Sequence, residues 1–310
     1  MKLRIRTDEP KSESLEDVFA SFIIHKVACN NSPATLNNYK DLLRTLSKYT
    51  DVTAPLEDLT KRKLDGIVVA MRNNGLANNS IATYVREINT FLSWCREEGL
   101  ITLQWHNIQE RETVIEIYSD EELARLLKRP PANCQFTIFR SWVIICFLMN
   151  CGCRSASLRA VLNKDVDLNK KQVTFRHTKT KKIQVVPLCS QMVSILKEYT
   201  SIRKGGQEAF LFCDQYGEQL SESALRQSIA RYNRARGVSK TSIHAFRHTF
   251  AHKYLVDCHG NALTLQKILG HSTLRMTRRY CELFDQDISE GYDENSPLAQ
   301  VLKVKRKIQK

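Results

Sequence analysis

Hydrophobic residues recur at helical spacing through the first hundred residues of the chain. One stripe covers residues 15–22, a second follows Pro33, and a third ends just before Gly75. Proline is tolerated in the first turn of a helix, and glycine commonly ends one. With a fourth stripe over residues 81–94, the pattern predicts four amphipathic helices. We expect them to form a small all-α domain.

The pattern changes in the second part of the chain. It predicts, in order, a helix opened by the capping box of Ser119 and Glu122, a fully buried helix at 142–150, strands at 172–177 and 183–188, and helices at 191–201 and 221–237. The fold class we expect is therefore mainly α, with a small antiparallel β-sheet in the second domain. The expected segments are a polar lead-in (1–12), the helical domain (13–103), a linker (104–117), the second domain (118–295) and a C-terminal tail (296–310).

The charge of the chain is strongly basic, and it is unevenly distributed. The formal net charge is +14 and the isoelectric point is near 9.4. Residues 1–110 carry equal numbers of basic and acidic side chains, so the whole excess belongs to residues 111–310. A basic excess of this size favours nucleic acid as the partner over an anionic membrane.

Cysteine usage and hydropathy indicate a cytoplasmic protein. The ten cysteines are scattered with no CxxC pair, which favours reduced thiols and argues against a zinc site. The N-terminus lacks the apolar core of a signal peptide. The most apolar stretch, residues 142–151, is about half the length that spans a bilayer.

The stretch from His244 to Tyr280 holds most of the candidate chemistry. His244 and Arg247 are three residues apart, so a helix presents them on one face. His271 follows a glycine that ends a helix, and Tyr280 lies about two turns further on. This convergence suits a phosphate. The candidate set, with an arginine after a glycine turn and a lysine at a hairpin tip added, is Arg154, Lys179, His244, Arg247, His271 and Tyr280.

These residues resemble the tyrosine recombinases of the phage-integrase type, the family that includes the Xer recombinases. The HxxRH, LGH-x8-Y and GxR blocks occur in the family's order, and the hairpin from Lys179 to Leu188 agrees. Residues 13–100 resemble the family's core-binding helices, so the resemblance covers the whole chain. It implies a SAM-like DNA-binding domain before the catalytic domain, without the N-terminal arm-binding domain of lambda-like integrases. It also implies a metal-independent and ATP-independent reaction that needs no cofactor.

The resemblance implies that three residues hold the DNA phosphate. Two guanidinium groups, on Arg154 and Arg247, can each grip non-bridging oxygens in bidentate fashion. His271 can hydrogen-bond the same phosphate. Together they would stabilise the charge that develops on the phosphoryl oxygens.

The other three candidates would exchange the bonds. Tyr280 is implied as the nucleophile, with His244 taking its proton and Lys179 protonating the 5′ oxygen as it leaves. The product is a 3′-phosphotyrosyl linkage, which a second 5′-hydroxyl can reverse. The family resemblance also implies four protomers on two duplexes with inverted-repeat core sites, and a tail at residues 296–310 that docks on a neighbouring subunit. The reaction would serve integration or excision of a mobile element, including transposition, or the resolution of DNA multimers.

Several alternatives stay open. Lys181 or Lys182 could replace Lys179, since all three lie at the hairpin tip. The family commonly has an acidic residue where this chain has Ser157, which leaves an inactive DNA-binding clamp as one alternative. A type IB topoisomerase, which shares this chemistry but relaxes supercoils as a monomer, is another.

DNA contacts are expected on both domains. Short polar side chains at the start of two helices suit contacts to base edges and phosphates, although a solvated helix face has the same pattern. The predicted contacts are Asn37, Ser80, Thr83, Arg86, Arg176, Lys181, Lys182, Arg231 and Lys240.

Overall fold

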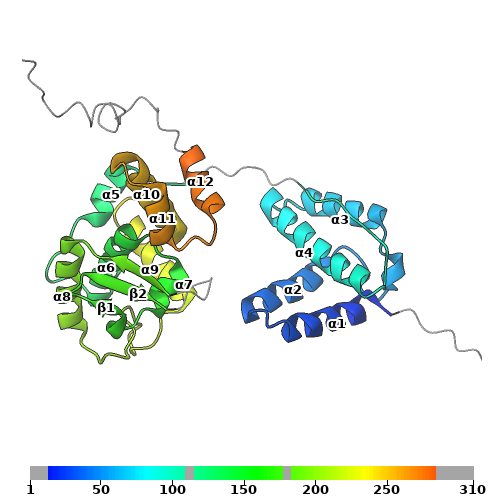
Figure 1. Cartoon of the computed structure of the whole chain (residues 1–310), viewed down its shortest axis with the longest axis horizontal. Coiled ribbons are helices and arrows are strands. Elements are labelled where there is room, and N and C mark those ends of the chain that lie inside the picture. The colour runs from blue at the N-terminus through cyan, green and yellow to red at the C-terminus, as the bar shows by residue number, and fades with distance from the viewer. Residues whose placement is uncertain (1–12, 109–114, 177–182, 284–310) are drawn as a thin grey trace, which may run out of the picture. The chain divides into compact units, whose positions relative to one another are not determined.

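The computed structural model describes residues 13–108, 115–176 and 183–283, and it divides into two compact units (Figure 1). Unit 1 ends at Thr113 and unit 2 begins at Val114. Each unit has its own hydrophobic core. The predicted fold class, mainly helical with a small antiparallel sheet, is confirmed. No helix among the described residues is long and apolar enough to cross a membrane.

Unit 1 is a bundle of four helices around an aromatic core. Side-chain oxygens of Ser14, Ser32 and Thr60 accept hydrogen bonds from the first-turn amides of three of them, which explains where these helices begin. In the core, the rings of Phe19 and Phe91 lie 4.8 Å apart. The helices are α1 (Leu15–Ala28), α2 (Pro33–Leu46), α3 (Lys61–Asn73) and α4 (Asn78–Glu97), with a 3₁₀ turn, η1 (Leu56–Asp58).

Residues 101–108, which include the start of the predicted linker, pack along unit 1. The Trp105 indole donates to Asp65 on α3 (3.0 Å), and Arg96 on α4 donates to the Leu103 carbonyl (2.8 Å). The segment therefore follows the surface of the bundle before the chain enters unit 2.

Unit 2 is built around the buried helix α6 (Phe136–Cys151), which was predicted from its continuous apolar run. Helices α5 (Asp120–Leu127), α8 (Ser190–Arg203), α9 (Glu222–Arg234) and α10 (Ile243–His252) pack against it. The capping box of Ser119 and Glu122 is present at the start of α5. The remaining helical elements are α7 (Ser155–Ala160), η2 (Asn163–Asp165), the π-helical turn η3 (Lys253–Asp257), α11 (Ala262–Leu269) and α12 (Leu274–Leu283).

The sheet of unit 2 has three antiparallel strands in the order β1-β2-β3. They are β1 (Val166–Asp167), β2 (Gln172–Phe175) and β3 (Gln184–Pro187), with Val173 paired to Val166 and to Val186. On β3, the Gln184 side chain donates to the Lys267 and Ile268 carbonyls at the end of α11. The sheet is thereby tied to the helix that precedes His271.

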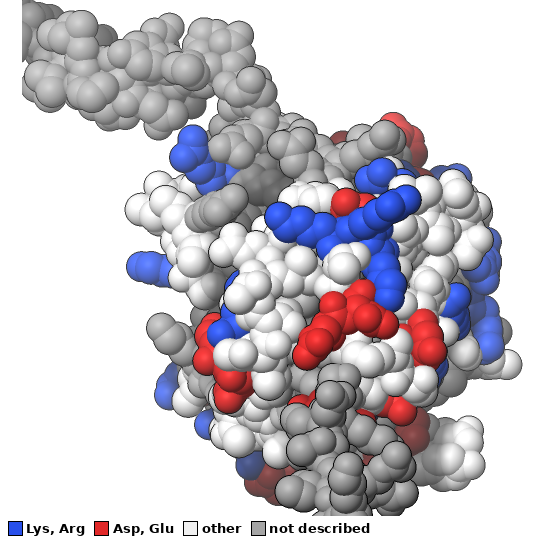
Figure 2. Space-filling model, turned by 90° about the vertical axis from the view of Figure 1, so that its right-hand side faces the viewer, with Lys and Arg blue, Asp and Glu red and all other residues white. Residues whose placement is uncertain are grey.

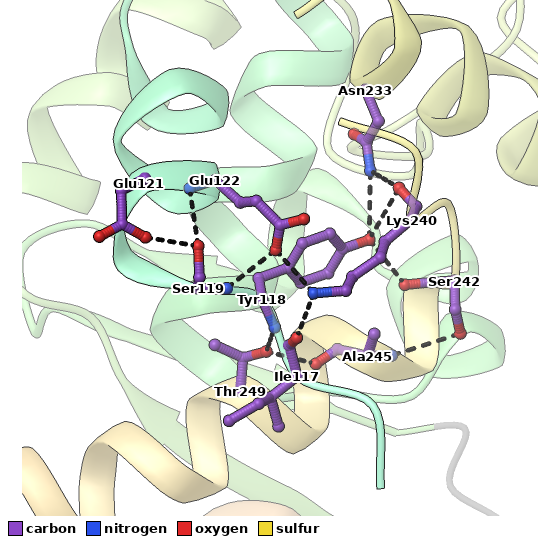
Figure 3. A network of polar contacts seen from close by, with 10 residues as sticks. All are labelled: Ile117, Tyr118, Ser119, Glu121, Glu122, Asn233, Lys240, Ser242, Ala245 and Thr249. Atoms are coloured by element: carbon purple, nitrogen blue, oxygen red, sulfur yellow. Dashed lines mark hydrogen bonds and ion pairs between the residues drawn. The ribbon is translucent and has the colours of Figure 1, made fainter. Parts of the chain in front are cut away.

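A network of hydrogen bonds joins the start of α5 to the segment before α10 (Figure 3). The Lys240 ammonium donates to the Ile117 carbonyl (2.9 Å) and to Glu122 (2.8 Å). The Asn233 amide donates to the Lys240 carbonyl (2.8 Å) and to the Tyr118 hydroxyl (3.1 Å). This network fixes the chain directly before α10, which carries two candidate site residues, His244 and Arg247.

Candidate active site

Helix α10 places two histidines and one arginine on adjoining faces. Ser242 caps the helix through the Ala245 amide. His244 lies exposed on the first turn, Arg247 is turned inward with 4% of its surface exposed, and His248 is half-buried. The His244 and His248 rings are one turn apart, with their centres 6.2 Å from each other.

Arg247 connects three separate parts of unit 2. Its guanidinium donates to the Gly152 carbonyl at the end of α6 (2.8 Å) and to the Leu269 carbonyl at the end of α11 (3.0 Å). It also donates to Nε2 of His271 (2.8 Å). Burial and the nearby Arg154 lower the pKa of Arg247 to about 10, so it remains charged at neutral pH.

His271 is held as a neutral imidazole by its two partners. Because an arginine can only donate, Nε2 of His271 must be the acceptor in their hydrogen bond, and the proton is on Nδ1. Nδ1 then donates to the Thr277 hydroxyl (2.8 Å). Burial, Arg247 and Arg154 lower the pKa of His271 to about 4, in agreement with the neutral form.

Tyr280 on α12 lies against these groups with 6% of its surface exposed. Its hydroxyl is 2.9 Å from Nδ1 of His248, and its ring is parallel to the His271 ring at 6.1 Å between centres. Tyr280 also acts on Arg247, whose pKa it raises against the lowering by burial and Arg154.

Arg154 enters from the loop between α6 and α7. It follows Gly152, whose φ of 55° lies in the left-handed region, and a Cβ at Gly152 would meet a Phe250 side-chain atom at 2.4 Å. Glycine is therefore required for the close packing of this turn. Burial, Arg247 and Arg154 lower the pKa of His244. Arg154 also lowers the pKa of Arg247 and that of His271.

The structure thus brings together five of the six candidates: Arg154, His244, Arg247, His271 and Tyr280. Lys179, like its alternatives Lys181 and Lys182, lies outside the described residues. Together with His248, the five clustered residues supply two guanidiniums, one phenol and three imidazoles. The cluster can bind a phosphate and present a hydroxyl to it.

Known proteins share this organisation. The profile of the phage integrase family matches residues 116–287, more than half of the chain, and the profile of the phage integrase SAM-like domain matches residues 14–109. The chain belongs to the phage integrase family. It is accordingly a tyrosine-type site-specific recombinase, as the resemblance of its motifs implied.

Curated relatives of this recombinase include tyrosine recombinase XerC proteins. The protein from Alcanivorax borkumensis is 25% identical over 87% of this chain and 90% of its own length. Those from Staphylococcus aureus are 24% identical over 92% of this chain and 97% of their own length.

Solved structures with the same fold include two integrases bound to DNA. The Tn1549 transposon integrase in complex with a circular intermediate DNA aligns with a TM-score of 0.73 at 18% identity, over 92% of this chain and 99% of that one. A lambda integrase tetramer bound to a Holliday junction also gives 0.73, at 16% identity over 91% and 81% of the two chains.

His248 was not among the residues predicted for the active site of this recombinase. Its signal was present, because His248 is the last residue of the HxxRH block and lies one helical turn after His244. The role of proton acceptor was assigned to His244. Within the described structure, however, it is His248 that hydrogen-bonds the Tyr280 hydroxyl.

Ser157, at the position where the family commonly has an acid, is buried in α7. A carboxylate stands beside the cluster on another helix. Glu222, at the start of α9, lies close enough to His244 to raise its pKa against the lowering by burial and the arginines. Glu222 and His244 both line a cavity of about 320 Å³.

The predicted DNA contacts of unit 1 lie on exposed helix surface. Asn37 on α2 and Ser80, Thr83 and Arg86 on α4 are exposed, and the Arg86 guanidinium donates to the Thr83 hydroxyl (3.3 Å). Basic and acidic side chains lie side by side on the face shown in Figure 2.

The predicted phosphate contacts of unit 2 differ in their surroundings. Arg231 is exposed on α9. Arg176 is half-exposed and paired with the buried Asp165 (2.7 Å). Lys240 is held by Glu122 and a backbone carbonyl, so its charge is already engaged within the unit. Of the three, Arg231 is exposed on the surface, whereas Lys240 is held by contacts within the unit.

Proposed function

We propose that this recombinase cleaves and rejoins DNA through a 3′-phosphotyrosyl intermediate on Tyr280. One observation carries the proposal: the Tyr280 hydroxyl is hydrogen-bonded to His248 and stands beside Arg247, on which Arg154 also acts. A phenol is a weak nucleophile at neutral pH. Two adjacent guanidiniums stabilise its ionised form and attract the phosphate that it attacks.

The remaining roles follow from what each group can reach. The contacts of Arg247 to Gly152, Leu269 and His271 use three of its five N–H groups and fix its plane. Arg154 is proposed to share the phosphoryl oxygens with it. His244, exposed at the mouth of the site, would contact the phosphate. Lys179 is proposed to protonate the leaving 5′ oxygen, as implied by the family.

The biological task is proposed at the level that the relatives support. The XerC relatives and the transposon and lambda integrases lead us to propose multimer resolution or the integration and excision of a mobile element. We propose that the enzyme works in the cytoplasm as a tetramer on two duplexes with inverted-repeat core sites. The proposed inter-subunit tail, residues 296–310, lies outside the described residues.

A covalent trapping assay tests the proposal. A DNA site is first selected from random duplexes by binding to the protein. A copy nicked near the cleavage point is then incubated with wild type and with Tyr280→Phe. The expected result is a denaturant-resistant protein–DNA band with wild type only. Binding without any adduct would contradict the proposal and favour the inactive clamp.

A second assay separates the recombinase from a topoisomerase. Plasmids carrying two copies of the selected site are expected to give recombinant products. Relaxation of plasmids without the site, at comparable rates and with no recombinants, would favour the topoisomerase.

A further inference from the structure

His248 contacts the hydroxyl that the proposed function makes the nucleophile. Its Nδ1 lies 2.9 Å from Oη of Tyr280, and the two rings are 5.7 Å apart at 49°. Such an arrangement aims a ring nitrogen at the hydroxyl. We infer that His248 is a further catalytic residue, which accepts the Tyr280 proton during attack and returns it during religation. The inference rests on the proposed function.

The direction of the hydrogen bond follows from the other neighbour of Tyr280. Arg247 carries a permanent positive charge beside the phenol, which favours the phenol oxygen rather than its proton facing the guanidinium. The single proton of the hydroxyl is then directed at Nδ1 of His248. His248 is therefore in the tautomer with the proton on Nε2, and the lone pair of Nδ1 accepts from the hydroxyl. A proton acceptor must lie within hydrogen-bond reach of the proton it takes, and His248 does.

The other two histidines of the cluster are less suited to this role. Both nitrogens of His271 are engaged, by Arg247 and by Thr277. Its ring plane is within 3° of the Tyr280 ring plane, so the two residues meet face to face. His244 lies one turn before His248, on the exposed side of the helix. Its position favours a contact with DNA.

The proton balance of the step is complete with this acceptor. As Oη of Tyr280 bonds to phosphorus, its proton passes to Nδ1 of His248, and the bond from phosphorus to the 5′ oxygen breaks. The leaving oxygen takes a proton from the general acid, proposed as Lys179. In religation a 5′-hydroxyl attacks and gives its proton back to the general acid, the phenol oxygen leaves, and the protonated His248 returns the proton to it. No oxidant, metal or nucleotide enters the step.

The titratable and charged groups of the described cluster favour transfer during the reaction over permanent ionisation of His248. His244 and Arg247 flank His248 on α10, and Tyr280 faces it from α12. Arg154 lowers the pKa of both Arg247 and His271. The permanent charges among them are positive. An imidazolium beside two guanidiniums is disfavoured until a phosphate brings negative charge into the site.

A measurement without DNA tests the contact itself. Nitrogen-15 spectra of the histidine side chains, assigned with a His248→Asn variant, report which ring nitrogen carries the proton. We expect the Nε2–H tautomer for His248 in wild type, and a changed Nδ1 shift in Tyr280→Phe. The Nδ1–H tautomer, or a spectrum that Tyr280→Phe leaves unchanged, would overturn the inference whatever the enzyme does to DNA.

The catalytic step is tested by the rate of adduct formation as a function of pH. In His248→Asn, the amide oxygen can occupy the position of Nδ1 and accept the hydrogen bond, but it cannot take a proton at neutral pH. In His248→Phe, both abilities are lost. We expect each variant to be slower at neutral pH by about 100-fold or more, as for loss of a general base. The histidine inflection of the wild-type profile should vanish, and His248→Asn should recover as pH approaches ~10, where a phenol ionises unaided.

A control and two contrary outcomes complete the test. His259→Asn changes an exposed histidine with a φ of 47°, a conformation that asparagine tolerates, and should keep the wild-type rate and profile. A His248→Asn profile parallel to that of wild type would show a structural role and overturn this inference alone. Absence of an adduct with wild type would overturn both the inference and the proposed function.

Discussion

Unit 1 buries only apolar and aromatic side chains among its described residues, whereas all buried polar and charged residues of the described structure lie in unit 2. A buried polar group costs free energy unless it is hydrogen-bonded. Unit 2 meets this requirement at Arg247 and His271 with partners drawn from several helices. The difference teaches that the core of unit 1 is held mainly by apolar packing, while unit 2 also holds buried polar groups, Arg247 and His271 of the candidate site among them.

The largest difference between the two units is expected when each loses an arginine that donates hydrogen bonds to backbone carbonyls. Arg247→Ala leaves the buried Gly152 and Leu269 carbonyls without this donor, at about 1–3 kcal/mol each. We expect the free energy of opening of α10 to fall by about 3–4 kcal/mol. The matched change, Arg96→Ala, loses one half-buried bond and should cost about 1 kcal/mol in α4. Native-state hydrogen exchange measures both, and equal costs would contradict the comparison.

A pair of glycines provides the next test. Gly152 and Gly75 both have positive φ, but a Cβ meets Phe250 at 2.4 Å and Leu269 at 2.7 Å at the first and nothing within 4 Å at the second. Gly75→Ala should cost about 1 kcal/mol through backbone strain alone. Gly152→Ala should cost about 2–3 kcal/mol because overpacking is added. Denaturant titration of the two variants measures the difference, and a Gly152→Ala cost no larger than that of Gly75→Ala would refute the packing argument.

Acid should weaken unit 2 through His271. Its pKa is 6.5 in the unfolded chain and about 4 in the folded one, so between these values the unfolded state binds more protons. The contribution of the neutral imidazole is complete above pH 6.5 and is lost as pH falls toward 4. We expect a loss on the order of 3 kcal/mol. His271→Gln, which can still accept from Arg247, should lack this component when unfolding is followed from pH 7 to 4. An identical pH dependence in the two proteins would contradict the assignment.

The smallest expected effects distinguish Lys240, proposed as a structural residue, from Arg231, proposed as a phosphate contact. Lys240→Met should cost about 1 kcal/mol through its bonds to Glu122 and Ile117 while leaving the salt dependence of DNA binding unchanged. Arg231→Met should leave stability unchanged and lower the slope of log affinity against log salt by about 1. The reverse pattern would restore Lys240 as a phosphate contact.

Much of the fold could be predicted because each helix has a local cause. Apolar spacing located the helices of unit 1, and the capping box of Ser119 and Glu122 located the start of α5. Strand β1 escaped prediction because two residues, Val166 and Asp167, show no alternation. The π-helical turn η3 has no sequence period of its own.

Most members of the site were predictable, with His248 the exception, but their contacts were not. Histidine and arginine spacing pointed to the cluster, yet the partners of Arg247 include backbone carbonyls, which leave no trace in the sequence. Helical spacing also cannot decide whether His244 or His248 contacts Tyr280, because Tyr280 is 32 residues after His248 and lies on another helix. Only the packing of α12 against the cluster makes that distinction.

The most direct test of the account is the identity of the amino acid that becomes linked to DNA. Wild-type protein is trapped on the nicked site and digested with trypsin and nuclease, and the modified peptide is sequenced by mass spectrometry. The account predicts a nucleotide 3′-phosphate on Tyr280 and on no other residue. A phosphate linked to a different side chain, or to the 5′ end of the DNA, would contradict it.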